Sequence, residues 1–206
     1  MTDDVTKARE DLAFLTSIVS DHTPALRSTG IVYGAAGLLY GAQCIINWLQ
    51  ITYWPTAPAI VPILHGFLPT VIFLVINVVV ARRSGIKGFG SGTAQRAIGA
   101  AFAGAGLANL SLIIVFASAA FRRDDFSIWL FFPVTVCALQ GAVWFAVGAI
   151  RRRSWMSGVA AGWFLTAIIT GVFVQNPLNY LLALGIGLIL FMAVPGYILM
   201  RISKAD

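Results

Sequence analysis

The sequence predicts an all-α polytopic membrane protein: six transmembrane helices in three successive hairpins, preceded by an N-terminal amphipathic cytoplasmic helix. Two observations carry this prediction. Of the 206 residues, 59% are hydrophobic and 11% are charged, with a mean hydropathy of +0.86. That is too little charge to cover the surface of a soluble domain of this size. The basic residues also stand at the ends of long apolar runs, as they do in membrane helices.

The N-terminal segment, residues 1–26, is the only substantial part predicted to lie outside the membrane. Its apolar residues recur at three- and four-residue spacing from Val5 to Val19, which indicates one apolar helix face. Asp21, His22 and Pro24 are expected to end this helix. Acidic residues outnumber basic ones in it, so we expect it to pack on this protein's own helix ends or on a partner rather than on anionic lipid alone.

Six apolar segments follow, each long enough to cross about 30 Å of hydrocarbon at about 1.5 Å per residue. A short Asn176-Pro177 turn separates the last two, so a five-span chain with a re-entrant segment is the alternative. The expected spans form a transmembrane domain over 27–201, followed by a cytoplasmic tail over 202–206. They lie near residues 28–50, 58–81, 97–120, 128–150, 155–175 and 177–200.

The distribution of Lys and Arg predicts the orientation. With the N-terminus inside, twelve of the 14 basic residues face the cytoplasm, and only Arg122 and Arg123 lie outside, directly before Asp124 and Asp125. This positive-inside asymmetry places both termini in the cytoplasm. Charges at helix ends do not make a phosphate-binding face, so the lipid bilayer is the expected partner and nucleic acid is not.

Aromatic residues gather near the predicted membrane boundaries, which supports the same spans. Trp155 and Tyr197 lie near the inner boundary. The outer boundary has Trp48, Tyr53, Trp54, Trp129 and Tyr180.

Glycine spacing is the clearest packing signal. Spans one, three and five are rich in small residues and spans two, four and six end in basic ones, which favours three hairpins of one polarity and leaves a triplicated unit open. G-x-x-x-G pairs put small residues on one helix face and let backbones approach closely. We expect them to pack inside the bundle, with a homo-oligomer interface as the alternative. The pairs are Gly30 with Gly34, Gly37 with Gly41, and Gly158 with Gly162.

Uncharged polar side chains within the spans are the candidate ligand-binding residues. Asn109 and Gln140 fall near the midplane, where each amide needs a hydrogen-bond partner. They are expected either to pair across the bundle or to line a pocket for a small neutral or weakly polar ligand. The candidate set is Asn109, Gln140, Cys137, Thr135, His65 and Asn47.

His65 is the one embedded histidine, and it lies between Pro62 and Pro69, which predicts a kinked or locally unwound outer part of the second span. One histidine with Cys44 at a similar depth does not complete a metal or haem site. No metal or cofactor is therefore expected. Cys44 and Cys137 are interpreted as small buried apolar side chains.

The spans contain no Asp, Glu, Lys or Arg. Ion-coupled transporters and proton pumps rely on such residues. No nucleophile stands with a base, and the glycine-rich loop at 85–92 lacks the Lys-Ser/Thr ending of a phosphate-binding loop. We therefore expect that the protein is not an enzyme.

Four segments resemble a loose group of small six-span inner-membrane proteins of bacteria, for which no activity is implied. The three-hairpin layout is also faintly similar to an acid-resistance membrane protein family, in layout alone. The segments are REDLAFL, QRAIGAAFAGAGLANL, ALQGAVWFAVGAIRRRSW and GLILFMAVPG.

The expected function is that of a non-enzymatic accessory or regulatory protein of the bacterial inner membrane. It would act through helix–helix contacts with itself, as a homo-oligomer, or with a membrane-protein partner. The alternative is a passive channel, carrier or binding protein for a small neutral or lipid-like molecule, with a cavity near Asn109 and Gln140.

Overall fold

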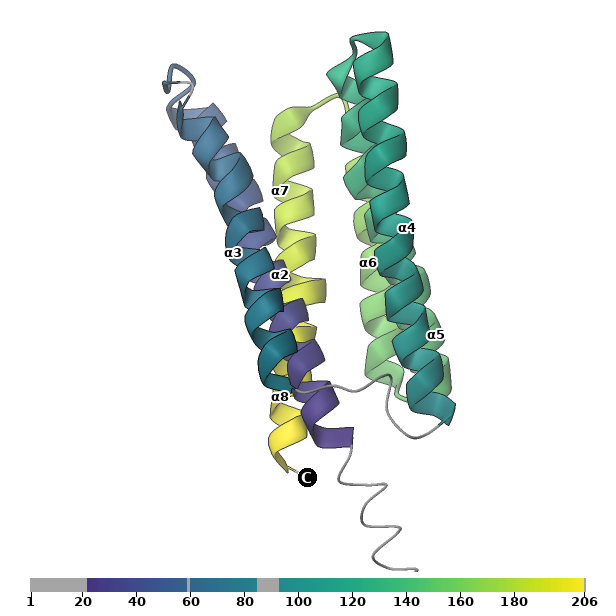
Figure 1. Cartoon of the computed structure of the whole chain (residues 1–206). Coiled ribbons are helices and arrows are strands. Elements are labelled where there is room, and N and C mark those ends of the chain that lie inside the picture. Colours follow the sequence, from purple (N-terminus) through teal and green to yellow (C-terminus); the bar gives the residue numbers. More distant parts are fainter. Residues whose placement is uncertain (1–21, 59, 85–92, 206) are drawn as a thin grey trace, which may run out of the picture.

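The protein is an all-α bundle of long helices that run up and down (Figure 1). The structure, a computed structural model, describes residues 22–58, 60–84 and 93–205. A short 3₁₀-helix, η1, precedes α5, and a π-helical turn, η2, lies between α7 and α8. The elements are α2 (His22–Tyr53), α3 (Ile60–Ser84), α4 (Thr93–Arg123), η1 (Phe126–Leu130), α5 (Phe131–Arg151), α6 (Ser154–Val172), α7 (Pro177–Leu188), η2 (Ile189–Ala193) and α8 (Val194–Ala205).

Six helical stretches in the described residues are long and apolar enough to cross a membrane, which confirms the predicted number of spans. The last span joins α7, η2 and α8 into one rod, so the five-span alternative is wrong. α3 is also continuous through Pro69, so its outer part is not unwound. The spans are Arg27–Tyr53, Ile60–Arg83, Arg96–Arg123, Phe126–Arg151, Ser154–Val172 and Pro177–Ser203.

The first and last described helices extend beyond the predicted boundaries of their spans. α2 begins at His22 and runs through Pro24, where the sequence predicts the end of a separate helix. A proline fits there because the N–H groups of a first helical turn have no partner within the helix. Residues 1–21, which hold the rest of the predicted amphipathic helix, lie outside the described residues. At the other end, α8 extends to Ala205, so the expected tail continues the helix.

The spans form two groups of three, seen side by side in Figure 1. α2 packs along α3 and along the whole last span, and α5 packs along α4 and α6. The two groups meet where α6 packs on α7 and η2. The two helices of each predicted hairpin do pack together. The two most extensive interfaces, however, are α2 with the last span and α5 with α6, and each of them joins two different hairpins.

α2 crosses the last span with the two backbones in contact. A β-carbon at Gly30 would lie 2.8 Å from the carbonyl oxygen of Gly196, and one at Gly196 would overlap the backbone of Gly34. Gly37 packs on the backbone of η2, and Gly41 packs on the side chain of Ile189 in η2. Only residues without a side chain allow such an approach, as in other G-x-x-x-G contacts. All four glycines of the first span thus face this chain's own last span.

The π-helical turn η2 shapes the same interface. The N–H of Val194 bonds to the carbonyl five residues earlier, and Pro195, which follows, has no N–H to donate. In a regular α-helix the proline ring would clash with a carbonyl of the preceding turn, and a π-bulge relieves this. The turn places Phe191 against Gly162 of α6, where a β-carbon would overlap its ring. Gly158 has open space around it, so its predicted packing face is not used within the described chain.

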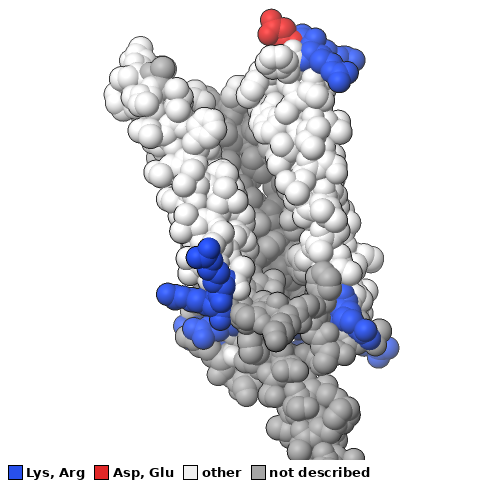
Figure 2. Space-filling model, in the orientation of Figure 1, with Lys and Arg blue, Asp and Glu red and all other residues white. Residues whose placement is uncertain are grey.

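Arginine residues gather at one end of the bundle, here called the basic end (Figure 2). The opposite end has Arg122 and Arg123, followed by Asp124 and Asp125, which are the only acidic residues in the described part of the chain. The alternating direction of the helices produces this asymmetry. The arginines of the basic end are Arg27, Arg82, Arg83, Arg96, Arg151, Arg152, Arg153 and Arg201.

Candidate functional site

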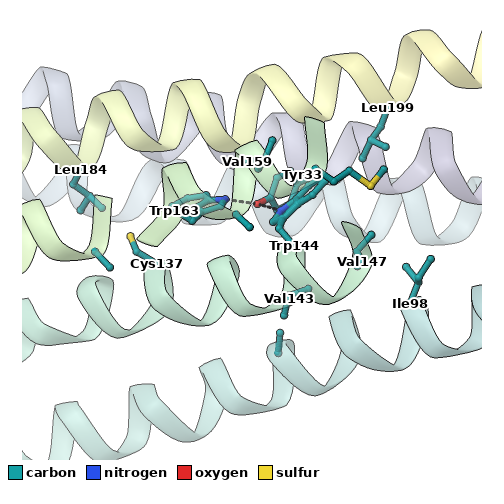
Figure 3. Close-up of a cluster of buried hydrophobic side chains, with 14 of the residues drawn as sticks. Tyr33, Ile98, Cys137, Val143, Trp144, Val147, Val159, Trp163, Leu184 and Leu199 are labelled. Atoms are coloured by element: carbon teal, nitrogen blue, oxygen red, sulfur yellow. Dashed lines mark hydrogen bonds between the residues drawn. The ribbon is translucent and has the colours of Figure 1, made fainter. Parts of the chain in front are cut away.

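Four hydrogen-bonded side chains, here called the Tyr33 cluster, join the two groups of helices: Tyr33, Gln140, Trp144 and Trp163. Figure 3 shows Tyr33 and the two tryptophans. Tyr33 extends from α2 toward α5 and α6. The indole N–H groups of Trp144 and Trp163 donate to its hydroxyl oxygen, at 2.6 and 3.0 Å. The hydroxyl in turn donates to Oε1 of Gln140 at 3.4 Å. One phenol therefore connects three helices that come from both groups.

The hydroxyl of Tyr33 uses its donor and two acceptor positions, which is all that a phenol offers. Trp144 and Trp163 are each 1% exposed, so their N–H groups have no other access to a partner. Transfer of an unpaired N–H or O–H from water to hydrocarbon costs several kcal/mol of free energy. Each of these groups would carry about that cost if it lost its hydrogen bond. The cluster is thus a satisfied link between helices rather than a set of free groups awaiting a ligand.

Aromatic rings surround the cluster. Phe102 of α4 meets Tyr33 edge to face with ring centroids 6.4 Å apart, and meets Trp144 at 6.3 Å. Trp155, near the start of α6, lies 5.8 Å from Trp144. Such tilted and edge-to-face pairs are the favoured aromatic geometries. Helices α2, α4, α5 and α6 therefore all contribute a ring to this core.

A tight turn between α5 and α6 sets the register of the two tryptophans. Arg152 adopts a left-handed conformation, with a φ of 52°, and its N–H bonds to the carbonyl of Gly148. A β-carbon at Gly148 would lie 3.3 Å from Cβ of Met156, so the two helices start close together. This close start brings the indoles of Trp144 and Trp163 to the same hydroxyl.

A second link between the groups lies toward the opposite end. The hydroxyl of Tyr180, on α7, donates to the carbonyl oxygen of Leu130 at 2.7 Å. The sequence suggests that Tyr180 belongs to an aromatic belt facing lipid. In the structure it is 3% exposed and is buried between helices instead. The side chain of Asn176 accepts from the N–H of Asn179 and caps α7 at this end.

The two midplane amides do not pair with each other in the described residues. Gln140 accepts from Tyr33, as above, while Oδ1 of Asn109 is buried and has no partner among the described groups. α4 and α5 do pack together, but Tyr33 reaches across from α2 and donates to Gln140.

The remaining predicted residues are spread over several helices and form no common site. Cys137 is buried on α5, and the hydroxyl of Thr135 donates to the carbonyl of Phe131 in its own helix. His65, half-buried on α3, has an Nδ1 without a partner in the part of the chain that is described. Asn47 is half-buried on α2. The sequence therefore identifies polar residues within the spans but does not predict which of them lie together.

Tyr33, Trp144 and Trp163 were not among the predicted site residues. A signal for them exists in the sequence. All three lie well inside predicted spans, away from the boundary belts where tyrosine and tryptophan are common. An amphipathic ring at that depth has to find its hydrogen-bond partner within the bundle.

An apolar groove, here called the α3–α4 groove, runs between α3 and α4 on the face shown in Figure 2. α3 packs on α2 and α4 packs on α5, and in the described residues the two do not pack along each other. Phe67 on α3 and Leu107 on α4 are examples of their exposed apolar side chains. Arg82 and Arg83 lie in the last turn of α3, and Arg96 lies near the start of α4.

Fold and charge distribution together define the class of the protein, a polytopic α-helical membrane protein with six spans. Comparison with known proteins identifies no family: no family model, curated protein or solved structure matches the chain. The resemblance to small bacterial inner-membrane proteins therefore depends on the four sequence segments alone.

Proposed function

We propose that the protein is a non-enzymatic accessory or regulatory protein of the bacterial inner membrane, with both termini in the cytoplasm. It acts through contacts that α3 makes with a second copy of the chain or with a membrane-protein partner. The proposal depends on the position of α3. Among the described helices it packs extensively on α2 alone, and its most apolar window has no buried residue.

The use of the glycines supports this choice of surface. The four glycines of α2 already pack on the last span, so the first glycine face is occupied within the chain. α3, in contrast, packs along α2 through side chains, with the rings of Tyr40 and Phe73 5.7 Å apart and two side-chain hydrogen bonds. Tyr40 donates to Thr70 Oγ1 at 3.5 Å, and Nε2 of Gln43 donates to the carbonyl of Gly66 at 3.2 Å.

The test is site-specific photo-crosslinking in intact membranes. A photoreactive residue replaces Phe67, which is 70% exposed on α3, and in a control variant it replaces Phe145, which is 62% exposed on α5. We expect a protein adduct from position 67 and none from position 145. An adduct of twice the chain mass identifies a second copy, and another mass identifies a partner. Lipid adducts alone from both positions would contradict the proposal.

A second candidate is a binding protein for a lipid-like molecule, favoured by the α3–α4 groove. The binding region would then be this groove rather than a cavity between Asn109 and Gln140, because Gln140 is bonded to Tyr33. Native mass spectrometry after gentle extraction tests it. Retained species of lipid mass support the candidate, and a bare protein in every preparation contradicts it.

A further inference from the structure

We propose that α3 binds a second copy of the chain, and that the contact is centred on the α2–α3 polar patch, formed by Gln43 of α2 with Gly66 and Thr70 of α3. The side-chain amide of Gln43 in one copy pairs with the same amide in the other. This inference depends on the proposed function, that α3 makes the intermolecular contact, and it names the partner and the residues that hold it.

Two hydrogen bonds between α2 and α3 form the patch. Nε2 of Gln43 donates to the carbonyl oxygen of Gly66 at 3.2 Å, and the hydroxyl of Tyr40 donates to Oγ1 of Thr70 at 3.5 Å. Both bonds lie at exposed positions, and Gly66 and Thr70 are themselves exposed residues. The polar groups therefore lie at the surface where the two helices meet, and a molecule that packs there can contact them.

The patch lies at membrane depth. Gln43 is ten residues, or about 15 Å, before the end of the first span at Tyr53. Gly66 is six residues, or about 9 Å, after the start of the second span at Ile60. Hydrocarbon at that depth offers no water to polar groups.

The amide of Gln43 has unused hydrogen-bonding capacity. A carboxamide has two N–H donors and an oxygen acceptor. Within the described residues this amide bonds to the carbonyl of Gly66 alone. One donor and the oxygen are therefore left for a partner, in a solvent that supplies none.

A second copy satisfies both of these groups. Two carboxamides can pair through two reciprocal N–H···O bonds, so the patch is complementary to itself. Two copies with the same orientation in the membrane have Gln43 at the same depth, and a two-fold axis along the membrane normal brings each patch against its counterpart. Residues 40–50 and 60–73 contain no Asp, Glu, Lys or Arg, so the two patches do not repel each other. A different protein would need a polar side chain at this particular depth, which a second copy always has.

Gly66 allows the close approach that such a pair needs. A β-carbon at Gly66 would meet no atom within 4 Å, so the surface of α3 is open at this point. Small residues let two membrane helices come near enough for hydrogen bonds between their side chains. Phe67, which is next in the chain and 70% exposed, lies beside this contact.

The experiment is disulfide crosslinking in intact membranes, with copper phenanthroline as the oxidant. Gly66→Cys places a thiol beside the two-fold axis. Gly104→Cys is the matched control, because Gly104 on α4 is also exposed and has open space around it. The natural chain is a second control, since Cys44 and Cys137 are buried. Denaturing electrophoresis without a reductant measures the fraction of the protein at twice the chain mass.

Two further substitutions within the Gly66→Cys chain test the amide itself. Gln43→Leu removes the amide pair. Asn77→Leu is its control, because the amide of Asn77 donates within its own helix, to the carbonyl of Phe73 at 2.8 Å. The melting temperature of each variant in detergent checks that the fold is kept.

We expect a covalent dimer from Gly66→Cys and none from Gly104→Cys or from the natural chain. Gln43→Leu should weaken association by about fivefold to tenfold, the effect of losing two hydrogen bonds between membrane helices, and should lower the crosslinked fraction accordingly. Asn77→Leu should leave that fraction unchanged.

Three results would overturn the inference. Equal crosslinking from Gly66→Cys and Gly104→Cys would indicate random collision, and an unchanged fraction with Gln43→Leu would exclude the amide pair. No dimer from Gly66→Cys would exclude the second copy. The photo-crosslinking at position 67 then separates the two proposals: an adduct with another protein retains the proposed function, whereas lipid adducts alone contradict it as well.

Discussion

α3 and α6 show opposite relations between apolarity and burial. The most apolar window of α3 has a mean hydropathy of 2.3 and none of its residues is buried, whereas that of α6 has 1.5 and 44% of its residues are buried. In a water-soluble protein the more apolar helix would be the more buried one. In a bilayer the lipid tails solvate apolar side chains as well as a protein interior does, so apolarity does not draw a helix inward.

The residues that are buried on α6 explain its position. Ala160, Gly162 and Ala167 are small and allow close packing, and Trp163 has a polar group to satisfy. α3 has mainly branched and large side chains, with Gly66 open to its surroundings. Close backbone packing and hydrogen bonds to other helices therefore hold α6 in the bundle. α3 has fewer contacts of either kind. Five predictions follow this contrast from its largest consequence to its smallest.

The largest effect is expected where backbones touch. Gly196→Ala places a methyl group into the backbone of Gly34 and should lower the free energy of unfolding by about 3 kcal/mol, since no rotamer can relieve the overlap. Gly104→Ala, on the open face of α4, should be neutral or slightly stabilising because alanine favours helix. Unfolding in mixed micelles measures both. Equal effects would show that the crossing of α2 and α8 is looser than described.

Truncation of leucine separates the packed helices from α3. Leu184 on α7 is 7% exposed, and Leu184→Ala should cost about 2 kcal/mol because it opens a cavity. Leu74 on α3 is 58% exposed, and Leu74→Ala should change stability by less than about 0.5 kcal/mol, since lipid fills the space. The same unfolding assay measures them. A cost at Leu74 comparable to that at Leu184 would indicate that another protein covers α3.

Removal of the Tyr33 hydroxyl tests the link between the two helix groups. Tyr33→Phe leaves two indole N–H groups and one amide without their partner and should cost about 1–2 kcal/mol, at the modest strength of hydrogen bonds within membranes. Tyr53→Phe, at a tyrosine that is 75% exposed, is the control and should be neutral. Tryptophan fluorescence should also change in the first variant only. An unchanged spectrum would mean that the indoles do not contact the hydroxyl.

The two midplane amides should respond in opposite directions. Gln140→Leu removes the acceptor of Tyr33 and should cost about 1 kcal/mol. Asn109→Leu removes a buried oxygen without a partner and should be neutral or stabilising by up to about 1 kcal/mol. Thermal unfolding of the two variants distinguishes them. A loss of stability of similar size in both variants would indicate that Asn109 and Gln140 bond to each other, as the sequence suggests.

The smallest effect concerns pH at the opposite end of the bundle. Hydrogen bonds from the hydroxyl and the N–H of Ser127 hold the pKa of Asp125 below its ordinary value. A depressed pKa stabilises the turn at pH values above the unfolded pKa of about 3.9, and this contribution is lost as the pH falls through the folded pKa. The amide resonance of Ser127 should therefore shift with a midpoint below about 3.9.

Two variants check the assignment of this shift. Asp125→Asn should abolish it, whereas Asp124→Asn should leave it unchanged. Asparagine suits position 124 because Asp124 has a φ of 48°, which asparagine tolerates. A midpoint at or above the ordinary carboxyl value would show that the bond to Ser127 is absent in solution.

Much of the fold could be predicted from local sequence. Long apolar runs predict the six spans because a helix must satisfy its own backbone in hydrocarbon. Their boundaries are less certain. α2 starts at His22 although Pro24 suggests a break, because a proline is tolerated in a first turn. G-x-x-x-G spacing predicts close packing of both glycines. Of the pair Gly158 and Gly162, however, only Gly162 packs closely on another described residue, Phe191.

The candidate site was harder to predict for a physical reason. Polarity marks Asn109 and Gln140 as residues that need partners, but the partner of Gln140 lies 107 positions earlier in the chain, on a helix that is not its neighbour in sequence. The three aromatic residues of the Tyr33 cluster look like ordinary apolar positions within each span. Only the way the helices pack brings their polar atoms to one point.

The sequence by itself therefore determined the class, the number of spans and the placement of the charges at their ends, because each of these depends on one segment and its solvent. The tertiary structure decided the partner of each helix, the exposure of α3 and the convergence on Tyr33. Those depend on which small residues let two backbones meet, and no single segment contains that information.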